Sequence, residues 1–183
     1  MSLTELLVPT YQQMLKALSA WLVKAQESSE EALSWRLAPD MFPLATQVRF
    51  ACLQAQEATY RLRDLPLPKA LDVLAEEGRN AGEAPGSFDD AQARISEALN
   101  ALEALGPGAL DEGAERTVTI ELRNGMMFDL SGERYARDWA LAQFYFHLMS
   151  AYAILRNGGV DLGKADYVAH MFAYLRPGTA PQG

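Results

Sequence analysis

The stretch YARDWALAQFYFHLMSAYAILR, residues 135–156, decides the fold. Most of it is apolar, and its pattern predicts one long helix. Three polar side chains, Gln143, His147 and Ser150, follow one another in it at intervals of four and three. At 3.6 residues per turn, these intervals place all three on one face of the helix. Because an unpaired buried polar group costs about 1–3 kcal/mol, the row indicates a polar pocket.

Just before this helix, the sequence predicts a β-hairpin. Val118, Ile120 and Leu122 alternate with polar residues, which is typical of a strand with one buried face. Asn124 and Gly125 follow, a pair that favours the tight turns of two-residue hairpin loops. A second alternating run comes directly after the turn. We therefore expect two antiparallel strands joined by this turn.

Three further helices are expected before the hairpin. Ser2 and Glu5 have the spacing of a capping box, so the first helix begins there, and Pro9 predicts a kink or a restart within it. Ser87 and Asp90 open the third helix in the same way. The expected elements are helices over residues 1–27, 43–63, 88–105 and 132–156, the hairpin over residues 117–130, and a disordered tail over residues 177–183.

Between the second and third helices the pattern is weaker. Residues 69–87 predict a short amphipathic turn around Leu71 and Leu74, followed by a loop. On the second helix, Arg49 falls outside the apolar face and is expected to be exposed to solvent. Together the elements predict one all-α domain, an up-and-down four-helix bundle with a long crossover and a hairpin between helices three and four.

Composition excludes several classes of protein. The 183-residue chain has a net charge of −8 and a pI of about 4.8, so we expect no nucleic-acid partner and no anionic membrane surface as a partner. It has no apolar stretch of the ~18 residues that a membrane span needs. The N-terminus lacks the basic start of a signal peptide, and the single cysteine, Cys52, rules out an internal disulfide. The expected location is cytoplasmic.

Several stretches resemble the DinB/YfiT-like superfamily of helical bundles. The resemblance lies in the LAPDMFP stretch of residues 37–43, in the long crossover after the second helix, and in the LRNGGV ending of residues 155–160. More narrowly, the chain is similar to a bacterial branch of that superfamily, a domain of unknown function. The resemblance covers nearly the whole chain, and it implies a bundle of four helices.

The resemblance also implies a metal site of three histidines, one on the second helix and two, four residues apart, on the last. In this sequence the three positions fall on Cys52, Gln143 and His147, so one of the three is a histidine. A neutral glutamine carbonyl is a poor ligand for zinc or nickel. We therefore expect no metal and no cofactor. If zinc or nickel is bound, the resemblance implies these three residues as its ligands.

Two residues carry alternative interpretations. His147 is either a ligand or general base, or a core histidine whose nitrogens are hydrogen-bonded to neighbours. Cys52 lies within a helix on an apolar face, away from the helix N-terminus or cation that lowers a thiol pKa. A buried, unreactive thiol is therefore expected, unless the fold brings Cys52 next to His147.

Three functions remain open, and the sequence does not decide whether the protein is an enzyme. The first is a metal-free pocket for a small molecule between the second and last long helices, lined by Gln143, His147 and Ser150, with Cys52 on its wall. The second is a metal-dependent thiol transferase or hydrolase that uses Cys52 and His147.

The third function is structural, that of an interaction protein acting as a homodimer. Tyr145 and Tyr152 lie seven residues apart on another face of the final helix, among apolar and polar neighbours. Such a mixed stripe fits a subunit contact better than a core. A homodimer is expected for the first function as well.

Overall fold

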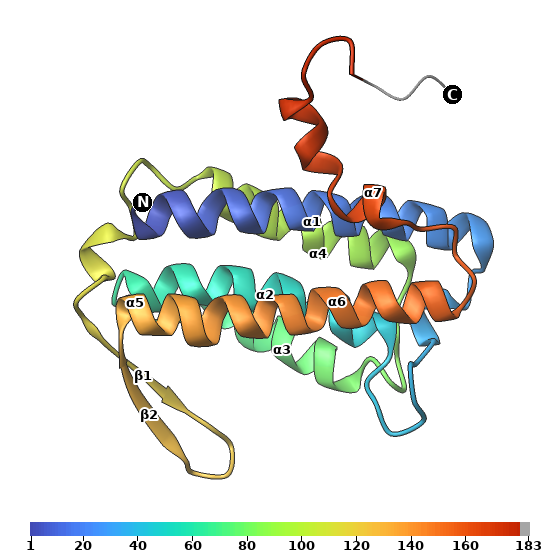
Figure 1. The fold of residues 1–183 in the computed structure, drawn as a ribbon. Coiled ribbons are helices and arrows are strands. Elements are labelled where there is room, and N and C mark those ends of the chain that lie inside the picture. The colour runs from blue at the N-terminus through green and yellow to red at the C-terminus, as the bar shows by residue number, and fades with distance from the viewer. Residues whose placement is uncertain (180–183) are drawn as a thin grey trace.

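The computed structural model describes residues 1–179, so the last four residues of the predicted tail lie outside the described part. Figure 1 shows the path of the chain. The helices are α1 (Leu3–Ser28), α2 (Leu44–Leu62), α3 (Lys69–Asn80), α4 (Phe88–Glu103), α5 (Gly132–Arg134), α6 (Leu141–Asn157) and α7 (Lys164–Tyr167). The remaining elements are strands β1 (Thr117–Glu121) and β2 (Met127–Ser131), the π-helix η3 (Tyr135–Ala140), and the 3₁₀ turns η1 (Ala32–Ser34), η2 (Asp111–Gly113) and η4 (Ala169–Tyr174).

Four long helices, α1, α2, α4 and α6, lie side by side around one core. In Figure 1, α1 and α6 run in one direction, and α2 and α4 run in the opposite one. α2 packs against α6, α3 and α4, while α1 packs against α4 and α6. The crossover from α2 to α4 passes through α3, and the hairpin connects α4 to the last long helix. The predicted all-α class with one small hairpin is confirmed.

α1 begins at the predicted capping box. The Ser2 hydroxyl accepts from the Glu5 amide, and the Glu5 carboxylate accepts from the Ser2 amide at 2.9 Å. The helix continues through Pro9 to Ser28, so the predicted restart does not occur. Leu7 before the proline and Tyr11 after it are both fully buried. Packing of both sides in one core outweighs the ~3 kcal/mol that an interior proline costs.

α3 is a regular helix of 12 residues, where the sequence predicted a short turn and a loop. Its buried residues, Leu71, Leu74 and Gly78, lie against α2. The hydroxyl of Thr46 donates to the Gly78 carbonyl at 2.8 Å, and Gly78 lies so close to the Phe50 ring that a Cβ would clash with it. α3 is clearly amphipathic but carries few apolar residues, so tertiary packing on α2 stabilises it.

The same helix explains why the prediction for Arg49 was wrong. Arg49 is 4% exposed rather than solvated. Its Nη1 donates to the Ala45 carbonyl at 3.0 Å, and Glu77 of α3 lies 3.8 Å from its Nε. Once α3 covers this side of α2, a position that would face water becomes part of the interior.

The hairpin has the predicted antiparallel pairing, but its loop contains three residues, Arg123, Asn124 and Gly125, rather than two. Val118 pairs with Leu130 and Ile120 with Phe128 in antiparallel register. Gly125 has a φ of +83°, the left-handed conformation that a tight turn requires. The side chains of Val118 and Ile120 are buried, whereas their neighbours in β1 are exposed. β1 is therefore the strand that anchors the hairpin to the helices.

The last long helix follows the prediction in extent but not in geometry. Between α5 and α6, six residues form a π-helix. Buried positions recur every four residues at Gly132, Ala136, Ala140, Phe144 and Leu148. In an ideal α-helix each four-residue step rotates the side chain by about 40°, so the four steps between these five positions add up to about 160° and the positions cannot share one face. The wider π turn, with its i→i+5 bonds, corrects this drift.

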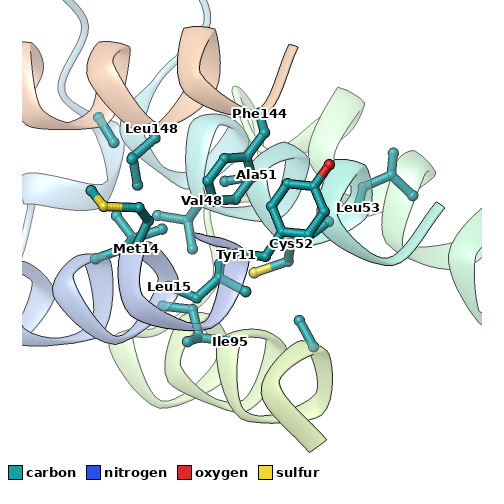
Figure 2. Packing of buried hydrophobic residues seen from close by; sticks show 14 of the residues in the cluster. Tyr11, Met14, Leu15, Val48, Ala51, Cys52, Leu53, Ile95, Phe144 and Leu148 are labelled. Atoms are coloured by element: carbon teal, nitrogen blue, oxygen red, sulfur yellow. The ribbon is translucent and has the colours of Figure 1, made fainter. Parts of the chain in front are cut away.

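Apolar side chains from all four long helices fill the core, as Figure 2 shows. Tyr11 of α1 meets Phe144 of α6 edge to face, with ring centroids 4.8 Å apart. Within residues 1–179, no helix combines the length and apolar character needed to cross a membrane.

Candidate functional site

His147 is the buried member of the predicted polar row, and it pairs with a residue of α2. Its Nδ1 lies 2.9 Å from Oε1 of Gln47. Nε2 of Gln47 in turn donates to the Phe42 carbonyl at 3.3 Å, which fixes the amide with its oxygen toward the imidazole. Since that oxygen can only accept, the network assigns the proton to Nδ1 and a lone pair to Nε2 of His147.

The surroundings keep this imidazole neutral. Burial lowers the pKa of His147 to about 4, because a charged ring would lose its hydration. The ring lies edge to face against Phe50 and Phe146, with centroids 5.1 and 5.3 Å away. At neutral pH His147 is therefore a hydrogen-bond acceptor with fixed orientation.

The imidazole lines an open pocket of about 530 Å³ between α2, the hairpin and the start of the last long helix. α2 contributes one face, β1 and the turn contribute a second, and the π-helical segment contributes Trp139. The apolar lining consists of Phe42, Phe50, Leu53, Ile120, Leu122 and Trp139. The π turn thus lies directly at the pocket, a common position for such turns at functional sites.

Three arginines surround the pocket, and each lies within ion-pair distance of a glutamate. Glu57 accepts from Nε of Arg61 at 2.6 Å, and Nη1 of Arg61 donates to the Thr119 carbonyl of β1 at 3.1 Å. This second bond ties the hairpin to α2. Two other arginines of the rim share one carboxylate: Glu76 lies 2.7 Å from Arg79 and 3.8 Å from Arg123.

The other two members of the predicted row are placed differently from His147. Gln143 and Ser150 are half-buried, and neither lines the pocket. Both lie at the edge of the buried arc of α6, while His147 lies inside it. The structure therefore brings one residue of the row to the pocket, rather than all three.

The placement of Cys52 on the pocket wall was wrong. Cys52 is fully buried on the opposite side of α2, and Figure 2 shows it within the packed cluster toward α1 and α4. Five residues separate it from Gln47, a rotation of about 140° around the helix. Burial raises the pKa of its thiol to about 12, so the sulfur remains protonated. The α2 residue that meets His147 is Gln47.

These donors do not fit the metal site that the superfamily resemblance implies. The site offers one imidazole, and the Gln47 oxygen beside it already accepts from Nδ1. Cys52 lies on the far side of α2, and Gln143 does not line the pocket. In the described part of the chain, no three histidine, cysteine or acidic side chains are grouped to hold an ion. Three protein ligands are usual even for catalytic zinc.

Sequence reasoning missed Gln47, although a signal for it exists. Gln47, Phe50, Gln54, Glu57 and Arg61 recur at intervals of three and four, so they share one face of α2. Its mixed polar and aromatic character resembles a solvated face. The hairpin and the last long helix cover it, and that tertiary contact is not visible in the local pattern.

The tyrosines of the last helix have partners within the chain. Tyr152 lies edge to face against Trp21 of α1 at 5.3 Å and contacts Tyr167 of α7 at 6.3 Å. Tyr145 packs beside Phe144, with centroids 5.6 Å apart. Of the two tyrosines on the predicted contact face, Tyr152 is thus occupied by contacts with α1 and α7 of the same chain.

Comparison with solved structures supports the superfamily resemblance. A crystal structure of a DinB family member protein from Shewanella denitrificans is similar to this chain with a TM-score of 0.72 and 29% sequence identity. The similarity covers 98% of this chain and 96% of that one. No curated protein matched.

A family model for a domain of unknown function, DUF1993, matches residues 3–168. The matched part begins at the first residue of α1 and extends just past α7, so it contains the four long helices, the hairpin and the pocket. The chain therefore belongs to the DUF1993 family, with a DinB-like fold.

Proposed function

We propose that this protein binds a small molecule, without a metal, in the pocket between α2, the hairpin and the last long helix. The observation that carries the proposal is the Gln47–His147 pair at the edge of an open, partly aromatic pocket. A neutral imidazole held in one orientation is a specific recognition group, and ligand pockets typically combine apolar walls with a few such groups.

A pocket-filling variant tests the proposal. Gln54 is half-buried and lines the pocket, whereas Gln26 lies exposed on α1. In a fluorine NMR screen of small polar fragments, we expect Gln54→Trp to abolish the binding seen with the wild type. The matched variant Gln26→Trp should keep it. Fragments that bind Gln54→Trp as well as the wild type, or a screen without any hit, would contradict the proposal.

The alternative of a metal-dependent thiol transferase or hydrolase has less support. It needs Cys52 and His147 to bind one ion. His147 of α6 contacts the Gln47 side of α2, whereas Cys52 lies on the opposite side of that helix. We expect zinc and nickel far below stoichiometric amounts in protein purified without added metal. A near-stoichiometric metal that disappears in His147→Ala would restore this alternative.

A homodimer is a second part of the proposal, through the outer face of α6. Ala142, Phe146, Met149 and Ala153 follow one another on that face, and Phe146 is 58% exposed. An exposed apolar stripe of this kind is typical of a subunit contact. We expect a dimer at micromolar concentration in analytical ultracentrifugation and a monomer for Phe146→Glu/Met149→Glu. A monomeric wild type would refute the dimer.

The cytoplasm remains the proposed location.

A further inference from the structure

The Gln47–His147 pair leaves one acceptor atom directed at the pocket. In residues 1–179, the buried side-chain nitrogen and oxygen atoms without a partner are Tyr11 Oη, Arg49 Nε and His170 Nδ1. The imidazole of His147 makes its hydrogen bond through Nδ1, which leaves Nε2 without a partner in the described part of the chain. Since Nε2 is nevertheless not one of the buried unpaired atoms, it is not buried. Nε2 is therefore reached by solvent from the pocket. It can accept a hydrogen bond from a bound molecule, and it has no proton to donate.

The walls beside this acceptor are flat and aromatic. The rings of Phe42 and Phe50 lie perpendicular to each other, 6.1 Å apart, and the Phe50 ring reaches His147 itself. Across the pocket, Trp139 packs against Phe128 of β2 at 6.1 Å. The Phe42–Phe50 pair is edge to face and the Trp139–Phe128 pair is tilted, and aromatic rings pack favourably against a further planar ring in either way.

The charged rim gives no net preference for an ion. Its three arginines meet Glu57 and Glu76, and Glu121 adds another carboxylate to the lining. A charged ligand would lose hydration among the apolar walls, and an anionic one would also have to compete with Glu57 or Glu76 for an arginine. Either charge therefore lowers the affinity relative to an uncharged ligand.

We infer that the pocket takes an uncharged aromatic molecule with one O–H or N–H donor, of the phenol or indole type, whose donor binds Nε2 of His147. The inference rests on the proposed function, because it specifies the ligand class of the same site. The ring packs between Phe50 and Trp139, and the donor proton points at the imidazole.

Three matched probes test this ligand class: p-cresol, 4-methylanisole, which lacks the donor, and 4-methylbenzoate, which is anionic. Binding is followed at pH 7.5 by NMR titration of the Trp139 indole resonance. We expect p-cresol to bind about tenfold more tightly than 4-methylanisole, which covers the Nε2 acceptor without giving it a hydrogen bond. 4-Methylbenzoate should bind at least about tenfold more weakly than p-cresol, because burying its charge is unfavourable.

Variants of the pair identify the acceptor. In His147→Phe, p-cresol and 4-methylanisole should bind equally. In Gln47→Glu, the new carboxylate raises the pKa of His147, so Nε2 gains a proton and becomes a donor. The preference should then change from p-cresol to 4-methylbenzoate. Gln54→Glu adds the same charge to the pocket lining without pairing with His147, so 4-methylbenzoate should bind still more weakly and the preference for p-cresol should not reverse.

The outcomes separate this inference from the proposed function. Equal binding of p-cresol and 4-methylanisole by the wild type overturns the ligand class but leaves a binding pocket. No binding of any probe at millimolar concentration also overturns the ligand class, and the fragment screen with Gln54→Trp then decides the proposed function. If His147→Phe fails to fold, the change of preference in Gln47→Glu remains a complete test.

Discussion

The two sides of α2 differ in what they bury. One side carries Ala51, Cys52 and Ala55, all fully buried against the other helices. The other carries Gln47, Phe50 and Gln54, and it meets a buried imidazole, a hairpin and an open pocket. Both sides are covered by protein, but one is dry and close-packed while the other keeps polar groups within reach of solvent.

Under the proposed function, this difference separates stability from ligand recognition in a single helix. The small residues of the dry side let neighbouring helices pack closely on α2, so changes there act on packing. The polar side holds fewer apolar contacts and one oriented hydrogen-bond chain, so changes there act on the protonation and direction of His147. Function on this helix is expected where packing is incomplete.

The largest expected effect comes from placing a cation on the dry side. Cys52→Lys buries an ammonium group within the apolar cluster, and we expect a loss of about 4 kcal/mol or more in unfolding free energy. Gln54→Lys introduces a lysine on the pocket side of the same helix. Because glutamine and lysine have similar helix propensities, this variant should cost less than about 1 kcal/mol. Urea denaturation measures both values. Similar losses in the two variants would mean that the sides do not differ.

The second prediction concerns pH and the buried imidazole. The pKa of His147 is about 4 in the folded protein and about 6.5 in an unfolded chain, so the unfolded state gains a proton first as the pH falls. The contribution of the neutral His147 to the free energy of unfolding is fully present above pH 6.5 and is lost progressively down to pH 4. Between pH 7.5 and pH 5 this loss amounts to about 2 kcal/mol.

Other groups that line the pocket, Glu57, Arg61, Arg79, Glu121 and Arg123, are present in both the wild type and a His147 variant. The informative quantity is therefore the difference between the pH profiles of the wild type and His147→Phe, measured by chemical denaturation. We expect the variant to lack the loss between pH 7.5 and pH 5. Parallel profiles would show that the imidazole is solvated in the folded state.

The sequence predicted well what local interactions decide. The capping boxes at Ser2 and Ser87 involve residues three apart, and the structure contains both. The hairpin follows from alternation and from the conformation of Gly125, which is also local. His147 could be singled out because a polar residue within an apolar helix face is unusual wherever it occurs.

What the sequence could not predict depends on contacts between distant segments. α3 forms because α2 covers its weak apolar face, and only then does Arg49 become buried. The expectation that Cys52 lies on the pocket wall follows the superfamily resemblance and the apolar face of α2, whereas the side of α2 that meets His147 carries Gln47. The π turn did have a signal in the four-residue spacing from Gly132 to Leu148. It was read as an ordinary helix.

The smallest expected effect belongs to the hydrogen bonds that orient the imidazole. Gln47→Leu removes the acceptor of Nδ1–H and the donor to the Phe42 carbonyl, and added apolar contact offsets part of the loss. We expect a cost of about 1–2 kcal/mol at pH 7.5, against less than about 0.5 kcal/mol for the matched Gln54→Leu. Stability alone does not separate orientation from packing, so nitrogen NMR of His147 must accompany it. The wild type should show a protonated Nδ1 and an unprotonated Nε2, whereas Gln47→Leu should show a mixture of tautomers. A single unchanged tautomer in Gln47→Leu would mean that something other than Gln47 orients the ring, and the pocket side of α2 would then lose its distinguishing feature.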